Sequence, residues 1–512
     1  MNLSRPTLDV PHRGLLTLAT MLAVIMQILD TTIANVALPS MQGNLGAAQD
    51  TINWVLTSYI VASAIATPIT GWVAEVIGRN RLFLVSVAGF TLASCMCGLA
   101  TSLAEMVAFR VLQGVFGASL APLSQAVLLD INPRERHGQA MAMWGAGIMV
   151  APILGPTLGG WLTDTFDWRW VFYINVPVGA LAFAGIALFM PASAHHRRSF
   201  DFFGFAMLGL FVGALQLLLD RGELLDWFSS TEIIIEAAVS LAALWVFVIH
   251  SMTSEHPFIH PQIFGDRNFV TACVFSFAIS VVLLATTALL PPILQRLMGF
   301  PTVTTGLAMA PRGIGTMIAM LMVGRLLRVV DARLLILGGL ALTTWSLYDM
   351  TGFSTDMDAW PVVLSGVMQG FGLGFVFVPM STVGFATLAP QLRTESAALY
   401  SLVRNIGSSI GISVVTSMLS RNIQINHAEL GEHLTPFSPE VDAAAHAVGM
   451  HANTLTFSSI LDNIVQAQAA MISYVDDFKL MMWVTLLVLP LILVLRKPPK
   501  STEVKPSMPD AD

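Results

Sequence analysis

The chain has 512 residues, of which 55% are hydrophobic and only 11% are charged, and its formal net charge is −7. Soluble domains carry about 25% charged residues, so a chain with so few charges could not cover a surface that faces water. Apolar runs of about 20 residues, which are long enough to cross a bilayer, recur from end to end. The composition excludes a soluble protein and predicts an integral membrane protein.

Fourteen apolar runs, each ending where charges, proline or glycine cluster, are predicted transmembrane helices. The first run, Gly14 to Leu38, is too long for the apolar part of a cleavable signal peptide and contains Asp30, so it should stay in the membrane. The predicted fold is therefore all-α with fourteen transmembrane helices. Their approximate limits are 14–38, 52–75, 82–103, 106–130, 138–162, 170–190, 202–219, 231–251, 269–291, 303–326, 333–353, 360–387, 396–419 and 478–495.

The positions of lysine and arginine indicate how the helices are oriented. With a cytoplasmic N-terminus, 17 of the 25 basic residues fall in cytoplasmic segments, 5 in external segments and 3 inside spans. Positive charge gathers on the cytoplasmic side of membrane proteins, so both termini are predicted to be cytoplasmic. The cytoplasmic group includes Arg197 and Arg198 in the linker after the sixth span. The basic residues inside spans are Arg110, Arg312 and Arg404.

Two pairs of motifs suggest that the chain contains a duplicated half. Gln113-Gly114 recurs as Gln369-Gly370 at an offset of 256 residues, and Pro133-x-x-Arg136 recurs as Pro390-x-x-Arg393 at an offset of 257. Chance similarity of helix ends is the alternative explanation. A duplication predicts two six-helix lobes, 1–190 and 268–495, separated by a linker with two extra helices (191–267) and followed by a tail (496–512). Transporters built from repeated halves bind substrate near the midplane.

An acid and a base inside predicted spans are candidates for proton coupling. Asp30 lies about two thirds of the way along the first span, where a charged carboxylate costs at least ~2.5–3.5 kcal/mol. Facing a cavity, it could bind and release a proton, because burial favours the neutral form of a carboxyl group. Arg110 in the fourth span stays charged and could compete with that proton. The alternative is a purely structural role for both residues.

The stretch from Gly71 to Arg79 joins the second and third spans and is a candidate gating element. Its glycines, Gly71 and Gly78, permit close approach and a tight turn. Glu75 near Arg79 or Asp130 could form a charge cluster that latches one conformational state. The alternative is a simple turn with basic residues on the cytoplasmic side.

The fifth span contains the stretch Gly155-Pro156-x-x-Gly159-Gly160, a second candidate for gating. Small residues spaced along one face let helices approach closely, and proline bends a helix. Close packing without any movement is the alternative. Residues predicted to line a substrate cavity are Gln27, Asn35, Trp54, Gln113, Gln369, Arg404 and Asn405.

The segment 420–476 is predicted to be a long external segment. It is polar in its first part and contains four histidines, which support metal binding only weakly. It is either a docking surface for a partner protein or a plain loop.

Several of these motifs resemble those of the major facilitator superfamily. The stretch from Gly71 to Arg79 resembles the loop motif after the second helix, with Glu75 where aspartate is usual, a change that keeps the charge and lengthens the side chain. Arg110-x-x-Gln113-Gly114 resembles the fourth-helix motif of this superfamily. Gly155-Pro156-x-x-Gly159-Gly160 in the fifth span resembles the fifth-helix motif of its antiporters. Three longer stretches are similar to the fourteen-span drug:proton antiporters, namely Leu29–Pro39, Trp168–Gly179 and Leu219–Ser230.

This resemblance implies a proton-coupled multidrug efflux antiporter that exports hydrophobic or amphipathic compounds by alternating access, with Asp30 and Arg110 in proton coupling. It also implies a bacterial inner membrane, a periplasmic adaptor of the EmrA type and an outer-membrane channel of the TolC type. No cofactor, metal ion or nucleic acid is expected, and no enzymatic activity. A dedicated metabolite exporter or an importer on the same fold is the alternative. A nucleotide-driven pump would need a phosphate-binding loop, and the sequence contains none.

Overall fold

The computed structural model describes residues 8, 10–48, 51–192, 199–432, 434, 438–447, 449, 451 and 454–495, and all regular elements in them are helical. The predicted basic linker 195–198 and the tail 496–512 lie outside these residues. In chain order the helices are α1 (Arg13–Leu45), α2 (Trp54–Ala66), α3 (Thr70–Ile77), α4 (Arg79–Leu99), α5 (Leu103–Gly117), α6 (Leu120–Ile131), α7 (His137–Ile148), α8 (Val150–Thr165), α9 (Trp170–Tyr173), α10 (Asn175–Phe189), α11 (Phe202–Arg221), α12 (Thr231–Thr253), α13 (Gln262–Gly265), α14 (Arg267–Pro292), α15 (Thr302–Leu326), α16 (Ala332–Met350), α17 (Trp360–Ala386), α18 (Arg393–Glu432), α19 (Pro439–Ala447) and α20 (Leu455–Val488).

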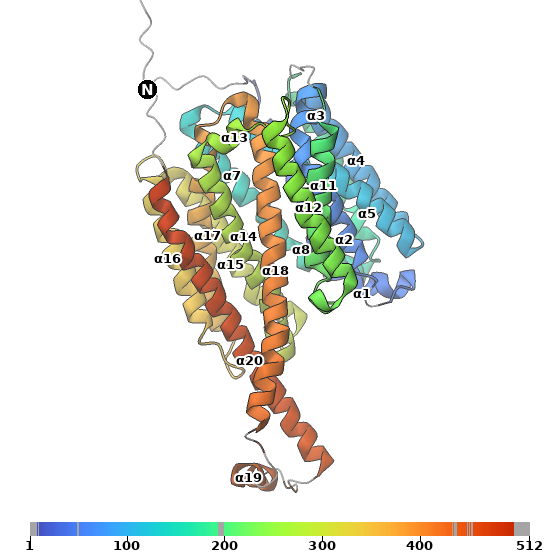
Figure 1. Ribbon diagram of the computed structural model, residues 1–512, viewed down its shortest axis with the longest axis vertical. Helices are drawn as coiled ribbons and strands as arrows, with labels where there is room; N and C mark the ends of the chain where they lie inside the picture. The colour runs from blue at the N-terminus through green and yellow to red at the C-terminus, as the bar shows by residue number, and fades with distance from the viewer. Residues whose placement is uncertain are drawn as a thin grey trace, which may run out of the picture.

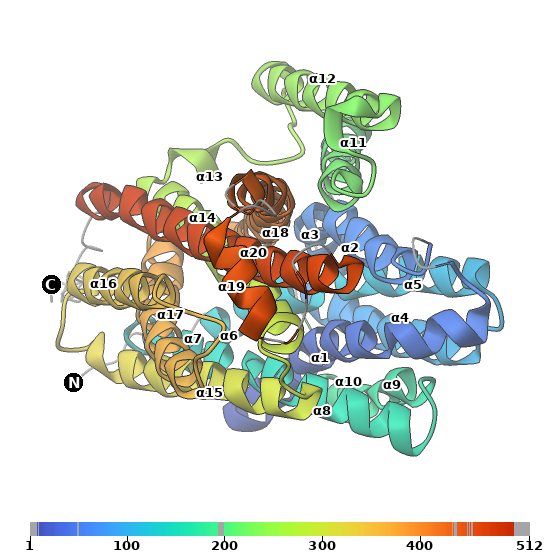
Figure 2. The same cartoon turned by 90° about the horizontal axis from the view of Figure 1, so that it is seen from below.

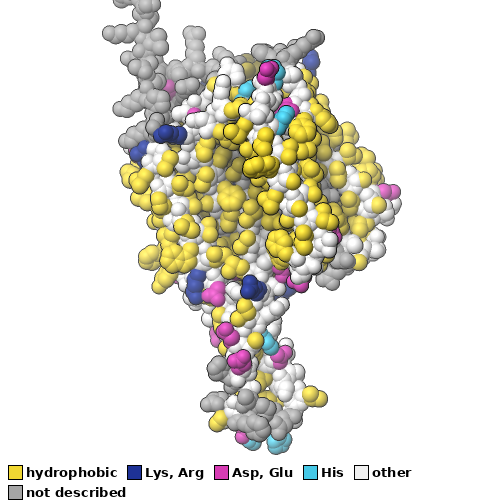
Figure 3. Space-filling model, in the orientation of Figure 1, with side chains coloured by type: hydrophobic (Ala, Val, Ile, Leu, Met, Phe, Trp, Pro, Cys, Tyr) yellow, Lys and Arg dark blue, Asp and Glu magenta, His cyan; other side chains and the backbone are white. Residues whose placement is uncertain are grey.

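The helices form a bundle whose outer surface is largely hydrophobic, as expected for a protein surrounded by lipid (Figure 3). Helix α1 begins, and α20 ends, at the same end of the bundle, which is called the terminal end below (Figure 1). Among the described residues, thirteen helical stretches are long and apolar enough to cross a membrane. The prediction of a multi-helix membrane fold is therefore confirmed.

The eleventh predicted span, 333–353, corresponds to α16, which is not among those thirteen. Its second half carries Thr343, Ser346 and Asp349, and these residues lower its mean hydropathy. Two of them are satisfied within the bundle, since Thr343 Oγ1 donates to the Gly339 carbonyl (2.9 Å) and Ser346 Oγ donates to the Ser365 carbonyl (2.6 Å). Helix α16 lies beside α17 (Figure 1), so it is a bundle helix even though its hydropathy is low.

The external segment differs from the prediction because it is mostly helical. Helix α18 continues through the predicted end of its span to Glu432, and α20 begins at Leu455, well before the predicted final span. The two helices project together beyond the bundle, with α19 at the tip (Figure 1). Asn426 Nδ2 donates to Ser473 Oγ (2.9 Å) between them, and a small apolar cluster around Val441 and Phe457 holds the tip together. This projection, residues 420–476, is called the hairpin below.

The two extra helices, α11 and α12, lie on the outside of the bundle, and α11 packs between α2 and α18 (Figure 2). Toward α18, Gln216 Oε1 accepts from Ser409 Oγ (2.9 Å) and the Leu219 carbonyl accepts from Ser413 Oγ (2.9 Å). Toward α2, Asp220 accepts from the Thr57 hydroxyl. The extra pair thus contacts helices of both halves, and the domain boundaries given above remain predictions.

Candidate functional site

Asp30 lies at the meeting point of several helices inside the first half of the chain. It sits about 26 Å along α1, and its side chain is 1% exposed. The surrounding groups come from α4, α5 and α10, each an apolar helix that carries one or two polar residues on its inner face. Gly114 lets α5 approach α2, because a Cβ at this position would lie 2.5 Å from the Tyr59 carbonyl oxygen.

Three side chains donate hydrogen bonds to the Asp30 carboxylate. Arg110 Nη1 lies 2.6 Å from Oδ2, while Gln113 Nε2 and Asn175 Nδ2 each lie 2.8 Å from Oδ1. Asn175 also donates to Ser94 Oγ (2.9 Å), which in turn donates to the Phe172 carbonyl (2.9 Å). The carboxylate therefore has a complete set of donors and no contact with bulk water.

The guanidinium of Arg110 is held as firmly as the acid. Its Nε donates to the Val55 carbonyl (2.9 Å), its Nη1 also donates to Gln113 Oε1 (2.7 Å), and the Tyr59 ring lies 4.4 Å from its Cζ. Arg110 is 0% exposed, and its Nη2 has no hydrogen-bond partner among the described residues. Removing one partner of such a buried pair costs about 3–5 kcal/mol, so protonation of Asp30 would have to be coupled to rearrangement of this cluster.

Sequence reasoning selected Asp30 and Arg110 together, and the structure brings them into contact. It assigned Gln113 to the substrate cavity, whereas the structure places Gln113 against Asp30. Asn175 and Ser94 were not selected. Both are polar residues inside otherwise apolar runs, which is the sequence signal that could have identified them. Asn175 also lies in Trp168–Gly179, one of the stretches similar to the drug:proton antiporters.

A second charge cluster lies at the terminal end. Asp130, at the end of α6, accepts from Arg79 of α4 and from Arg393 Nη1 of α18, the latter at 2.6 Å. Asp130 is 5% exposed and Arg393 is 2% exposed. The Asp130–Arg393 pair joins the two halves of the chain, and Glu75, which the sequence analysis grouped with Arg79 and Asp130, is half-buried in α3. Arg393 was noticed only as a member of the repeat.

The start of α18 also touches α3 and the segment before α14. A Cβ at Gly71 would lie 2.8 Å from the Glu395 Cα, so this glycine permits close approach between the halves. Glu395 accepts from the backbone N–H of His260 and lies 2.7 Å from His260 Nδ1. Gly78 has φ 90°, a conformation that favours glycine, at the junction of α3 and α4. The stretch is therefore a turn that is also part of an interface between the halves.

The glycines of α8 differ in what they face. A Cβ at Gly155 would collide with the Thr32 side chain, and one at Gly159 would lie 3.2 Å from Ile33 Cγ2, so both permit close packing of α8 on α1. Gly160 has nothing within 4 Å of a Cβ position. Pro156 lies in α8, and its side chain is outside the described part of the structure.

The predicted cavity residues are spread over both halves. Gln113 and Gln369 are fully buried, and Gln369 Nε2 donates to Thr286 Oγ1 (3.2 Å). The Arg221 guanidinium lies 5.4 Å from the Trp54 ring. Half-buried residues of this set are Gln27, Trp54, Arg404 and Asn405, and the exposed one is Asn35.

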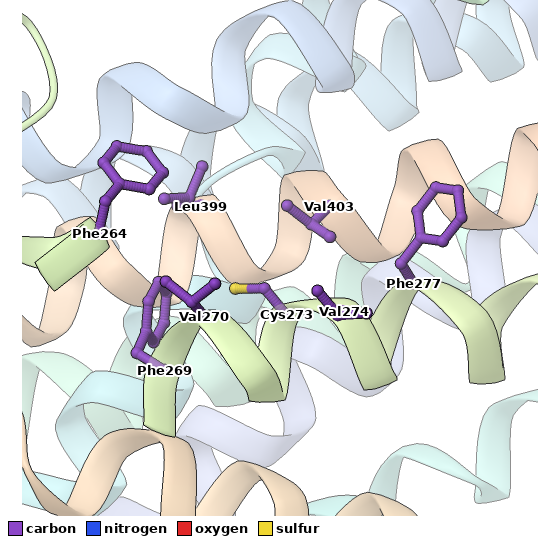
Figure 4. Close-up of a pocket in the computed structure, with 8 residues that line it drawn as sticks. All are labelled: Phe264, Phe269, Val270, Cys273, Val274, Phe277, Leu399 and Val403. Carbon is purple, nitrogen blue, oxygen red and sulfur yellow. The ribbon is translucent and has the colours of Figure 1, made fainter. Parts of the chain in front are cut away.

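An apolar pocket of about 310 Å³ lies between α14 and α18 near the terminal end (Figure 4). Its wall consists of phenylalanine, valine and leucine side chains and one cysteine, including Phe264, Phe277, Cys273, Leu399 and Val403. With only apolar groups on its wall, the pocket suits hydrocarbon, such as lipid tails or apolar parts of a substrate.

A polytopic helical bundle with a buried acid–base cluster and a charged contact between its halves defines a membrane transporter of the two-lobed type. The sequence model of the Major Facilitator Superfamily matches residues 20–412, and the chain belongs to this superfamily.

Relatives of similar length support the assignment. The chain is 35% identical over 487 residues to the fatty acid resistance protein FarB of Neisseria gonorrhoeae, covering 94% of this chain and 96% of that one. It is 37% identical over 436 residues to the multidrug export protein EmrB of Escherichia coli K12, covering 84% of each chain. Among solved structures, the human organic anion transporter MFSD10 superposes with a TM-score of 0.59 at 14% identity over 93% of this chain and all of that one, which shows the shared fold alone.

Proposed function

We propose that this protein is a proton-coupled efflux antiporter that exports hydrophobic and amphipathic compounds by alternating access. The observation that carries the proposal is the buried Asp30 carboxylate, which is fully supplied with donors and paired with a permanent cation. Relatives at 34–37% identity are named as exporters or resistance proteins for drugs or fatty acids, which favours export over import.

The coupling follows from the charge states of this cluster. Ionised, Asp30 pairs with Arg110; protonated, it is neutral and no longer balances the charge of the arginine. One elementary charge crossing the membrane contributes ~2.3 kcal/mol per 100 mV, and one pH unit contributes ~1.4 kcal/mol per proton. A single proton exchanged for substrate therefore suffices to sustain a substrate gradient of tens- to hundreds-fold.

The test is substrate efflux from proteoliposomes under an imposed pH gradient. Asp30→Asn keeps the shape of the side chain but cannot ionise, so we expect it to abolish proton-driven efflux while substrate binding by the purified protein partly survives. Asp30→Glu should retain some activity. Asp349→Asn is the matched control, because Asp349 is an exposed carboxyl on α16. Wild-type rates in Asp30→Asn would remove Asp30 as the coupling site and leave Glu75 and Asp130 to be examined.

The proposed orientation places the terminal end in the cytoplasm of a bacterium and the hairpin on the outside of its inner membrane. The distribution of basic residues supports it. Contacts between the halves gather at the terminal end, where α18 meets α3 and α6, and α15 meets α7. In this orientation the cytoplasmic side is closed, as it is in an outward-facing or an occluded state.

The hairpin is the proposed docking surface for a periplasmic adaptor of the EmrA type, which would connect to an outer-membrane channel of the TolC type. It projects well beyond the apolar surface of the bundle and carries acidic and histidine side chains (Figure 3). Replacing residues 425–470 with a short flexible linker should abolish co-purification of the adaptor and leave efflux from proteoliposomes intact. Unchanged adaptor binding would show that the hairpin is only a connection.

A further inference from the structure

The second half of the chain contains a buried polar cluster formed by Arg312 of α15, Gln369 of α17 and Thr286 of α14. Arg312 Nη2 donates to the Leu283 carbonyl (3.0 Å) and Gln369 Nε2 donates to Thr286 Oγ1 (3.2 Å). Gln369 and Thr286 are 0% exposed and Arg312 is 7% exposed. Helix α17 packs against both α14 and α15, so it brings the three residues into the same part of the bundle (Figure 1).

This cluster is the repeat-related counterpart of the Asp30 site. Gln369 follows Gln113 by 256 residues, and Thr286 follows Asp30 by the same interval. The hydrogen bond between the members is also repeated, since Gln113 donates to Asp30 (2.8 Å) and Gln369 donates to Thr286 (3.2 Å). The second half therefore keeps the hydrogen bond and replaces the carboxylate with a hydroxyl.

The arginine is kept as well, but it comes from a different helix. The position 256 residues after Arg110 is Gly366, and a Cβ at Gly366 would lie 3.5 Å from the Arg312 Cβ. Gly370, the counterpart of Gly114, permits a closer contact still, because a Cβ there would lie 2.2 Å from the Arg312 carbonyl oxygen. Arg312 thus lies beside α17, the counterpart of α5, which carries the arginine in the first half. The main chemical difference between the two clusters is the missing acid.

Without that acid, the cluster holds a permanent positive charge that no group of the described residues balances. Arginine does not deprotonate in proteins, and Arg312 Nη1 and Gln369 Oε1 have no hydrogen-bond partner among those residues. Asp477 of α20 is one helical turn from Met481, whose sulfur accepts from Thr286 Oγ1 (3.6 Å). It makes no ion pair with Arg312, and both its carboxyl oxygens lack partners in the described part of the chain.

We propose that Arg312, Gln369 and Thr286 form a binding site for the carboxylate of an anionic amphiphilic substrate, which supplies the charge that Asp30 supplies in the first half. This inference rests on the proposed function, because the ligand is a compound that the transporter carries. A guanidinium N–H with no partner is the donor that a carboxylate accepts most strongly.

The surroundings of the site suit such a ligand. Val282, Leu289 and Met481 belong to the buried apolar cluster next to Thr286, so the surroundings of the site are hydrocarbon-like. Pro311 directly precedes Arg312 inside α15 and removes a backbone hydrogen bond there. A helix weakened at this point can bend, which gives the buried arginine a route to the substrate during the transport cycle.

The experiment measures equilibrium binding of dodecanoate and of dodecanol, which has the same chain without the charge, to the purified full-length protein in neutral detergent. Arg312→Gln should weaken dodecanoate binding at least about tenfold and leave dodecanol binding unchanged. Thr286→Asp supplies the missing acid within the cluster, so it should also weaken dodecanoate binding selectively. Arg421→Gln, an exposed arginine on α18, is the matched control and should change neither.

Two results would overturn the proposal. One is dodecanoate affinity that stays at the wild-type value in Thr286→Asp. In this variant Arg312 is present and paired with the new acid, so it tests the site even if Arg312→Gln fails to fold. The other is loss of phosphatidylglycerol binding, with dodecanoate binding retained, in Arg312→Gln, which would identify the occupant as a lipid headgroup.

Efflux of a cationic dye separates this inference from the proposed function. If wild-type protein shows no proton-driven efflux of ethidium or of any other compound in proteoliposomes, the proposed function fails. If ethidium efflux is intact and Arg312→Gln leaves dodecanoate binding unchanged, only the carboxylate site is rejected.

Discussion

Asp477 of α20 is a buried acid next to a half-buried one, Asp476. It is 0% exposed, and neither carboxyl oxygen has a hydrogen-bond partner among the described residues, whereas the adjacent Asp476 pairs with Lys479 (3.1 Å). A buried polar group without a partner costs about 1–3 kcal/mol. We therefore expect Asp477→Leu, which has a similar volume, to raise the melting temperature of the purified protein by a few degrees.

Thermal unfolding in detergent checks this expectation, with Asp476→Leu as the partly exposed control that should give no increase. A lower melting temperature for Asp477→Leu would mean that the acid is stabilised by a contact absent from this conformation. Loss of efflux in a variant that folds normally would instead make Asp477 a functional carboxyl.

At the residue scale, the sequence predicted which side chains matter better than which of them touch. Asp30 and Arg110 stood out because a charged residue is costly in an apolar helix, and that argument needs no structure. It could not assign Gln113 to Asp30 rather than to a cavity, or find Asn175, because contacts between distant helices depend on packing. The inter-lobe partner of Asp130, Arg393, was missed for the same reason.

At the scale of one helix, α8 offers a direct test of close packing, because two of its glycines face different surroundings. A Cβ at Gly155 would collide with the Thr32 hydroxyl and lie 2.8 Å from the Thr32 Cβ, whereas one at Gly160 would meet nothing within 4 Å. Gly155→Ala should push α8 away from α1, close to Asp30, and reduce proton-driven efflux severalfold. Gly160→Ala should leave efflux unchanged, and equal losses in the two variants would contradict the packing argument.

The apolar runs predicted the bundle well because the bilayer sets both the length and the composition of a spanning helix. The same rule says nothing about helices in water. The polar residues of the hairpin carry no span signal, so the sequence predicts only a docking surface or a loop. Its helices are stabilised by contacts between α18 and α20. Helix α16 is the opposite case. It was predicted as a span and lies in the bundle, but its hydropathy is lower than that of the thirteen apolar stretches.

At the scale of the whole molecule, the conformational state depends on contacts between the halves at the terminal end. The Asp130–Arg393 pair is almost fully buried and joins α6 to α18. Another contact, between Arg328 Nη2 and Gln139 Oε1 (2.7 Å), also joins the halves but is exposed to solvent. Exposed polar contacts contribute little to stability, so the buried pair should dominate the closure of this end.

Arg393→Gln is therefore expected to open the terminal end. It removes a charge-assisted hydrogen bond of about 1.5–3 kcal/mol and leaves Asp130 paired with Arg79, so the population of the open state should rise by roughly ten- to a hundredfold. The probe is a cysteine at Ala142, which is buried where α7 meets Gly324 of α15, in a protein whose three native cysteines are replaced.

Its reaction rate with a membrane-impermeant maleimide added on the terminal side measures opening. Arg393→Gln should accelerate the reaction by at least about tenfold, while Arg328→Gln, the exposed contact, should change it less than about threefold. Equal acceleration by both variants would mean that the buried pair has no special role in closure. Unchanged rates in both would place the latch outside this contact, with Glu395 and His260 as the next pair to separate.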